Sequence, residues 1–343
     1  MRSNDTVRTA SGTTRRRVIT ILGAAAGLSL SGVSWSRPAR AGVNLYTWQG
    51  TTLGADSTIT LAHTSREGAD AVFNMVVAEL NRLEAIFSLH RDDSEISRLN
   101  RDGRVNRPSA DMLALLAEAR HYSEISDGAF DVTVQPLWNL YADHFSRYPD
   151  DEKGPLAAQV TAARALVDYR RIETNPLYVK LDRKGMGITL NSIGQGYITD
   201  RVADLLKANG IEHVLVSLGE TRALGDHPEG RPWVVGLKDP RNPERIERSI
   251  DLVDMAVATS GGYGTVFDRA GRFNHLFDPK TGASADAHIG VSVIAPRATE
   301  ANGLATALYV APVKQAESIL KRASKKATAI VTTPDGVTRT LTA

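Results

Sequence analysis

The stretch Thr189-Leu190-Asn191-Ser192-Ile193-Gly194-Gln195-Gly196-Tyr197-Ile198-Thr199-Asp200 predicts a strand end, a tight glycine turn and the start of a helix. Residues 187–190 before the turn have strand character. After it, apolar residues recur at the spacing of one helix face, and Asn209-Gly210 ends the helix. Glycines let a bulky anion approach the backbone, and the free N–H groups of a helix start attract phosphate. The turn is therefore a candidate phosphate site, although most such turns only let a strand pack on a helix.

Composition places the chain among ordinary globular proteins, with 343 residues, 42% apolar and 23% charged. The absence of Cys excludes disulfides, thiolate metal sites and a Cys nucleophile. Residues 1–41 contain seven Arg and one Asp, a net charge of +6, so the overall +2 leaves −4 for the remainder. We therefore expect no nucleic-acid partner.

The first 41 residues have the pattern of an export signal. Arg15-Arg16-Arg17 precedes an apolar run over residues 19–33, and Ala39-Arg40-Ala41 fits a small-x-small cleavage site. Paired arginines in this position resemble a twin-arginine signal. We predict that residues 1–41 are a signal peptide cleaved near Ala41 and that residues 42–343 are one domain in a bacterial periplasm. The alternative is a membrane anchor, but the run is short and rich in small residues, so no stable span is expected.

Patterning along the rest of the chain predicts an α+β fold, a single mixed-sheet domain with flanking helices. Helices are predicted at residues 72–87, 109–122, 155–167, 198–208, 300–310 and 313–323. Strands are predicted at residues 57–61, 178–181, 187–190, 214–218, 233–237, 248–252, 256–259 and 291–295, with a final hairpin turning at Pro334-Asp335-Gly336. Residues 128–138 are interpreted as a loop entering a strand, and residues 143–155 as a surface excursion.

In this order, the motifs resemble those of the FAD:protein FMN transferase (ApbE) family. The most specific are Ala129-Phe130-Asp131, Ile193-Gly194-Gln195-Gly196-Tyr197, and His275 followed by Asp278-Pro279-Lys280-Thr281-Gly282. The similar segments extend over nearly all of residues 53–310. The resemblance implies the ApbE (T-fold-like) architecture.

The resemblance also implies an activity. Such enzymes use FAD as substrate and Mg²⁺ as cofactor, and they attach FMN through a phosphoester to a Thr or Ser of an acceptor protein with release of AMP. The acceptors are flavoprotein subunits of membrane redox complexes. The export signal suggests a NosX-type member with a NosR-like or similar acceptor.

The family pattern assigns roles to particular positions. His275 corresponds to the residue that deprotonates the acceptor hydroxyl, and the pKa of a histidine suits a base near neutral pH. Ser192, Asn302 and Thr306 correspond to the metal ligands, and the last two share one helix face. The positions expected to contact FAD are Leu53, His90, Ala129, Phe130, Asp131, Thr189, Gln195 and Leu276.

Four of these positions depart from the family pattern. Thr189 replaces an Asp, Gln195 replaces a Lys or Glu, and Asn302 replaces a metal-binding Asp. His90 stands where the family usually has an aromatic ring. Amide oxygen is a weaker ligand for Mg²⁺ than carboxylate, so two alternatives remain: an FAD-binding carrier or assembly factor without catalysis, and an FAD pyrophosphatase. Glu220 and Glu300 are candidates to replace the missing carboxylates.

Overall fold

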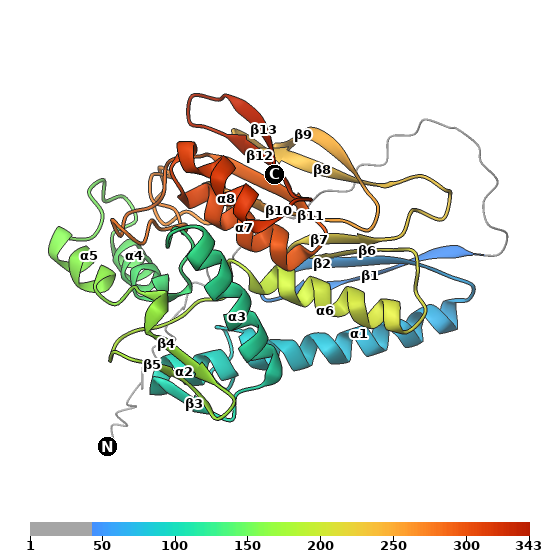
Figure 1. Ribbon diagram of the computed structural model, residues 1–343, viewed down its shortest axis with the longest axis horizontal. Coiled ribbons are helices and arrows are strands. Elements are labelled where there is room, and N and C mark those ends of the chain that lie inside the picture. The colour runs from blue at the N-terminus through green and yellow to red at the C-terminus, as the bar shows by residue number, and fades with distance from the viewer. Residues whose placement is uncertain (1–42) are drawn as a thin grey trace, which may run out of the picture.

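The computed structural model describes residues 43–343, and its centre is an eight-stranded sheet (Figure 1). Every neighbouring pair is antiparallel. In spatial order the strands are β1 (Asn44–Thr52), β2 (Ala55–His63), β6 (Val214–Leu218), β7 (Thr221–Leu224), β10 (Ala256–Ser260), β11 (Gly290–Ala295), β12 (Thr328–Thr332) and β13 (Thr338–Thr342). The predicted α+β class is confirmed. The expectation of a mixed sheet is wrong, because this sheet contains no parallel pair of strands.

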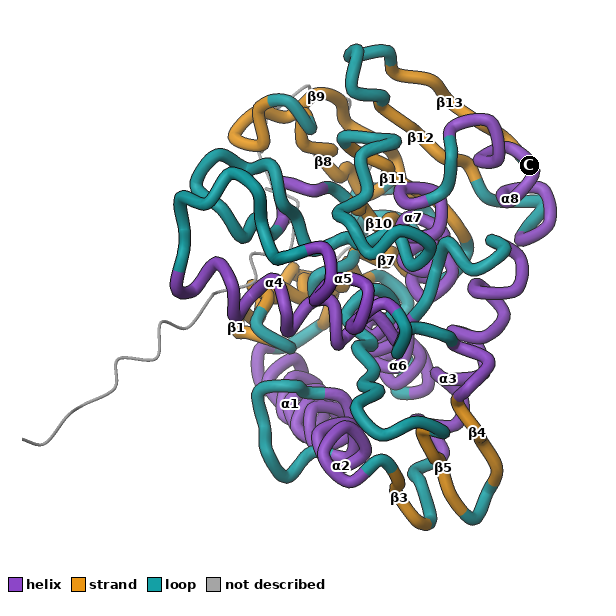
Figure 2. Tube along the Cα trace, turned by 90° about the vertical axis from the view of Figure 1, so that its left-hand side faces the viewer, coloured by secondary structure: helices purple, strands orange, loops and turns teal. Residues whose placement is uncertain are grey.

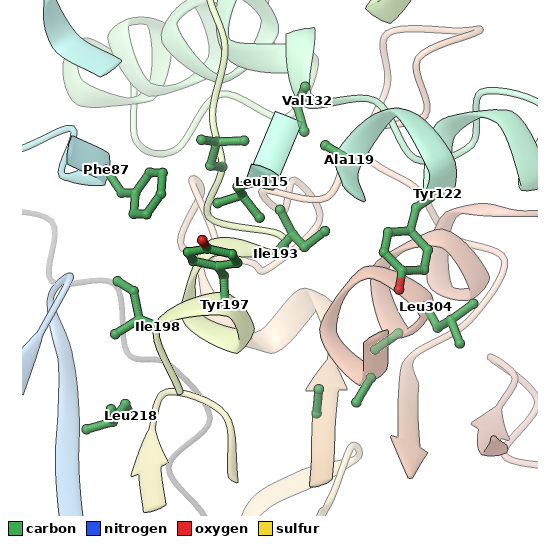
Figure 3. Packing of buried hydrophobic residues seen from close by; sticks show 14 of the residues in the cluster. Phe87, Leu115, Ala119, Tyr122, Val132, Ile193, Tyr197, Ile198, Leu218 and Leu304 are labelled. Atoms are coloured by element: carbon green, nitrogen blue, oxygen red, sulfur yellow. The ribbon is translucent and has the colours of Figure 1, made fainter. Parts of the chain in front are cut away.

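Helices cover one face of this sheet. Against it lie α1 (Arg66–Phe87), α6 (Gly194–Ala208), α7 (Ala298–Val310) and α8 (Ala316–Ala323), and α3 (Ala110–Ile125) packs on α7. Figure 3 shows part of the resulting core, in which Tyr197 of α6 lies between Phe87 of α1 and the side chains of Leu115 and Ile193. The rings of Phe87 and Tyr197 meet edge to face, with centroids 5.7 Å apart.

A separate hairpin covers the other face. It consists of β8 (Trp233–Asp239) and β9 (Asn242–Leu252), paired as a two-stranded sheet. Side chains alternate across a strand, so Val214 and Val216 join the core under the helices while Leu215 packs with the hairpin. The sheet therefore separates two apolar layers.

Two smaller units complete the fold at the edge of the helical layer. A three-stranded sheet contains β3 (Arg104–Asn106), β5 (Tyr178–Leu181) and β4 (Ile172–Asn175), and α2 (Glu95–Asp102) lies on it. Figure 2 shows this sheet at the opposite end of the molecule from β8 and β9. The second unit is α4 (Gln135–Arg147) with α5 (Ala157–Arg164). Tyr141 of α4 packs there against Phe273 and Phe277 from the later loop.

Three local predictions are wrong. Residues 187–190 are not part of a sheet, because β5 pairs instead with β3 and β4. Residues 132–134 form a 3₁₀ turn rather than a strand, and α4 follows at once, with Pro136 in its first turn. Proline fits a helix start, where its missing N–H costs nothing. The predicted surface excursion therefore begins only after Arg147.

Within residues 43–343, no helix has both the length and the hydropathy needed to cross a membrane. The predicted signal peptide lies outside the described residues.

Candidate active site

Backbone hydrogen bonds form the turn that the sequence singles out. Thr189 is fixed because its N–H donates to Val132 O at 2.8 Å. Two N–H groups then converge on Leu190 O, from Ile193 at 3.0 Å and from Gly194 at 2.5 Å. Ile193, the N-cap residue of α6, provides no side-chain cap. The first N–H groups of α6 are thus left for partners from outside the helix.

One of these partners comes from α7. Asn302 Oδ1 accepts a hydrogen bond from Gly196 N at 3.3 Å. The two helices approach so closely that a Cβ atom on Gly196 would lie 2.4 Å from Ala298 O. A side chain of any size would push the helices apart. This close contact is the reason for glycine at the second position of the Gly194-Gln195-Gly196 turn.

Asp200 of α6 fixes the start of α7. Its buried carboxylate accepts from Ala298 N and Thr299 N, both at 2.9 Å. Arg222 donates to it at 2.8 Å. A carboxylate at a helix N-terminus satisfies orphan N–H groups and favours the positive end of the helix dipole. The cap holds Asn302, on the next turn of α7, in place.

The three predicted metal ligands come together at this helix crossing. Thr306 Oγ1 lies 3.4 Å from Ser192 O and 3.2 Å from Ser260 Oγ. Asn302 stands one turn earlier on the same face of α7. The structure thus groups a main-chain carbonyl, an amide and a hydroxyl from segments about a hundred residues apart in the sequence.

These donors fit Mg²⁺ in kind. Mg²⁺ takes oxygen ligands, uses few from the protein and fills its octahedron with water or phosphate oxygens. Among residues 43–343, no group of three or more His, Asp or Glu side chains could hold a metal ion. The Ser192, Asn302 and Thr306 oxygens are all neutral, so a cation at this crossing would need further ligands.

His275 faces the same cavity from the loop before β11. Its Nδ1 lies 3.1 Å from Thr265 O. Because a carbonyl only accepts, the proton is on Nδ1 and the lone pair is on Nε2. No residue within 43–343 hydrogen-bonds Nε2. Burial lowers the pKa of His275 below its ordinary value, and the Thr265 carbonyl opposes that shift. The ring is thus a neutral base at neutral pH.

The loop with Asp131 forms another wall. Asp131 Oδ1 accepts from Thr133 N at 2.8 Å and from Thr133 Oγ1 at 2.6 Å, and Oδ2 accepts from Tyr169 N at 3.0 Å. Burial raises the pKa of Asp131, while these hydrogen bonds oppose the shift. Both carboxylate oxygens have partners, so Asp131 is held rigidly at the cavity edge.

Ten of the twelve predicted site residues line one cavity: Leu53, Ala129, Asp131, Thr189, Ser192, Gln195, His275, Leu276, Asn302 and Thr306. Phe130 and His90 do not line it. Phe130 is 1% exposed and packs edge-on against Tyr122. Packing in the core removes its apolar ring from water. His90 is exposed in the turn after α1. The ligand roles of all twelve residues remain predictions.

Several lining residues were not predicted. Ser260 is the last residue of β10, and Gly261 and Thr265 come from the loop after it, where small residues were the only signal in the sequence. Trp138, the last residue of the segment interpreted as a loop entering a strand, also lines the cavity. Glu220, one of the two candidate replacement carboxylates, lines it as well, and burial raises the pKa of its carboxyl well above the ordinary value. The sequence could not show which of the two candidates reaches the cavity.

Comparison with known proteins agrees with the family that the sequence motifs resemble. A family model described as "ApbE family" matches residues 53–331. A Haemophilus influenzae protein named FAD:protein FMN transferase is 34% identical over 273 residues, which are 76% of this chain and 78% of that protein. A Vibrio cholerae protein of the same name is 33% identical, over 73% of this chain and 76% of that protein.

Solved structures agree with the sequence matches. The apo form of the Pseudomonas stutzeri flavinyl transferase ApbE superposes with a TM-score of 0.74 at 30% identity, over 87% of this chain and 95% of that one. The Vibrio cholerae flavin transferase ApbE gives a TM-score of 0.74 at 26% identity, over 88% and 97%. The match extends over almost the whole of both solved chains.

Proposed function

The chain belongs to the ApbE family, and on this basis we propose that it is an FAD:protein FMN transferase. It attaches the FMN half of FAD through a phosphoester to a Thr or Ser hydroxyl of an acceptor protein and releases AMP. The observation that supports this most directly is the convergence of three features on one cavity. These are the neutral His275 ring, the N-terminus of α6 and the oxygen group of Ser192, Asn302 and Thr306.

The reaction needs one bond formed and one broken. The acceptor hydroxyl oxygen attacks the FMN-side phosphorus of the pyrophosphate, and the bond from that phosphorus to the bridging oxygen breaks. The hydroxyl proton goes to His275 Nε2, whose lone pair is free because Nδ1–H donates to Thr265 O. AMP leaves with the bridging oxygen and its electron pair.

The chain's own residues position the pyrophosphate. The start of α6 directs the positive end of its dipole to phosphate oxygens, and the Gln195 N–H remains to donate, since the Gly194 and Gly196 N–H groups bond Leu190 O and Asn302 Oδ1. Mg²⁺, held by Ser192 O, Asn302 and Thr306, would neutralise phosphate charge when bound. Leu53 lines the cavity at the tip of the β1–β2 hairpin, close to Gly194 of α6, and its N–H donates to Glu84 Oε1 at 2.9 Å. The hairpin tip thus forms a fixed wall of the cavity.

The decisive test uses purified protein, FAD, Mg²⁺ and a flavin-acceptor domain. A fluorescent adduct of the acceptor that survives a denaturing gel is the expected result. EDTA should suppress its formation, and excess Mg²⁺ should restore it. If folded, FAD-binding protein modifies no periplasmic acceptor, the proposal is refuted.

Two rival functions give different outcomes in the same reaction. A carrier without catalysis is favoured by the neutral metal donors, and it would bind FAD equally well in EDTA and release no AMP. A pyrophosphatase would convert FAD to FMN and AMP without any acceptor. Chromatography of the products with and without acceptor separates the three functions.

The place of action is part of the proposal. The twin-arginine pattern of residues 1–41 supports export to the periplasm, with cleavage near Ala41. The acceptor would then be a flavoprotein subunit of a membrane redox complex, NosR-like or similar, with its target hydroxyl on the periplasmic side. Fractionation of cells that express the full chain, with and without Arg16→Lys and Arg17→Lys, tests the location.

A further inference from the structure

Glu220 is a buried carboxylate in the active cavity to which the proposed mechanism gives no role. It lies in the tight turn between β6 and β7 and is 7% exposed. It lines the active cavity and also a second, smaller cavity under β8. It therefore stands at the partition between the two spaces.

The contacts of Glu220 lead directly to the oxygen group. Glu220 Oε1 accepts from Asn302 Nδ2 at 2.8 Å, and the backbone N–H of Thr259 donates to the same carboxylate. Asn302 is one helical turn from Thr306, whose hydroxyl lies 3.4 Å from Ser192 O. The carboxylate thus contacts the amide nitrogen of Asn302, and all four residues line the same cavity.

Charge makes this carboxylate unlike its buried neighbours. Asp200 is paired with Arg222 at 2.8 Å, and Asp131 is satisfied by three donors. Glu220 forms no ion pair with Lys, Arg or His in residues 43–343, and two neutral donors are its partners. A buried carboxylate without a cation is costly. Next to a pyrophosphate it would also repel the substrate.

A divalent cation between Glu220 and the phosphates removes both costs. We propose that Glu220 supplies the anionic oxygen ligand of the cation that Ser192, Asn302 and Thr306 hold through neutral oxygens. The inference rests on the proposed function, since the cation is the one placed there. It explains how a site whose other protein ligands are all neutral holds a doubly charged ion, which prefers carboxylate oxygen.

The competing role for Glu220 is structural, as a hydrogen-bond acceptor that orients Asn302. Glu220→Gln separates the two roles. Glutamine keeps the length of the side chain and an oxygen that accepts from Asn302 and Thr259, and it removes the charge. A purely structural role predicts unchanged cation binding in this variant.

Direct titration with Mn²⁺, followed by electron paramagnetic resonance in the presence of FAD, tests the inference without any acceptor. We expect Glu220→Gln to weaken Mn²⁺ binding about tenfold or more, a loss typical of disturbed metal sites. Glu300→Gln is the matched control, because Glu300 is on α7 with Asn302 but does not line the cavity. Its affinity should stay within twofold of the wild-type value.

Moving the carboxylate from position 220 to position 302 provides the second test. Asn302→Asp combined with Glu220→Gln returns one carboxylate to the site, and we expect it to recover most of the lost affinity. Circular dichroism and FAD binding report whether the variants fold. If Glu220→Gln does not fold, Glu220→Asp keeps the charge but retracts the oxygens, and weaker Mn²⁺ binding is again expected.

Two outcomes overturn the inference: wild-type affinity in the folded Glu220 variant, or no Mn²⁺ binding by the wild-type protein. The proposed function fails separately. Absence of transfer to any acceptor, together with Glu220-dependent Mn²⁺ binding, refutes the transferase and leaves the cation ligand standing.

Discussion

At the scale of single residues, His275 is the group whose removal should separate binding from chemistry. Its ring accepts the hydroxyl proton in the proposed reaction but holds no pyrophosphate oxygen. We expect His275→Ala to slow FMN transfer by roughly a hundredfold to ten-thousandfold, the range of general-base catalysis, and to leave FAD affinity within a few-fold. Adduct formation and FAD fluorescence titration measure the two effects. His121→Ala, on the exposed side of α3, is the control. Equal loss of affinity and rate would contradict the assignment.

The same ring sets the acid limb of the pH profile. Burial lowers the pKa of His275 from 6.5, so the ring stays neutral at pH values where a free histidine is already protonated. Protonation removes the base. Transfer should therefore be constant as pH falls to about 6.5 and should decline only below that value. Plots of kcat/KM against pH, with an acceptor domain stable in acid, measure it. A decline that begins above pH 7 would mean that another group limits the rate.

Residue identities together with the family resemblance gave a large part of the site but not its charge. The resemblance implied an oxygen group of Ser192, Asn302 and Thr306, and the structure places these residues in one cavity, with Thr306 next to Ser192 O. Glu220 was only a candidate beside Glu300, because which carboxylate reaches Asn302 depends on how β6 and β7 pair with the rest of the sheet. Contacts between residues so distant in sequence follow from the tertiary fold.

At the scale of helices, the Asp200 carboxylate that caps α7 is expected to contribute strongly to the free energy of unfolding. Asp200→Asn would turn an NH₂ group toward the N–H donors of Ala298 or Thr299. We expect a loss of about 3 kcal/mol in the free energy of unfolding, as for other broken buried charge networks. Urea unfolding measures it. Asp204→Asn, on the next turn of α6 and exposed, is the matched control and should cost below about 1 kcal/mol. Equal losses would argue against the cap.

The close crossing of α6 and α7 gives a second prediction at this scale. Gly196→Ala would place a Cβ atom 2.4 Å from Ala298 O, so we expect a loss of about 1–3 kcal/mol in the free energy of unfolding. At Gly194, two residues earlier, the nearest atoms to a new Cβ would lie 3.8 and 3.9 Å away. Gly194→Ala should be neutral or slightly stabilising. Urea unfolding of both variants measures these changes. An unchanged free energy of unfolding in Gly196→Ala would contradict the close approach of α6 and α7.

Periodicity predicted the helices better than the short strands. The apolar face of α1 and the Ser109 cap of α3 are visible in the sequence, and both helices were predicted, although α1 begins at Arg66, earlier than expected. Residues 187–190 look like a strand because they are apolar and buried, yet they have no ladder partner. Burial of an extended segment produces the same sequence pattern as a sheet.

At the scale of the whole molecule, FAD should stabilise the complete fold because its cavity joins distant parts of the chain. Ligand that binds only the native state adds about 2.7 kcal/mol at a hundred times its Kd. We expect the unfolding temperature to rise with FAD concentration, and FMN to raise it less because it lacks the AMP half. Differential scanning calorimetry measures both. No rise with FAD at saturating concentration would show that the cavity does not bind it.

Strand order is the part of the whole that the sequence could not reveal. β2 pairs with β6 across about 150 residues, and β7 pairs with β10. Local patterns identify strands one at a time, whereas partners depend on packing over the entire sheet. Similarity to a family whose members share the topology supplied what periodicity lacked.

The cavity wall runs from Leu53, near one end of the described chain, to Val310, near the other. During synthesis, Asn302 and Thr306 leave the ribosome only after nearly every other wall residue. A nascent chain that stops before α7 lacks the helix that faces Ser192 and Gly196. FAD that contacts both ends of this wall can therefore bind only after α7 has been synthesised.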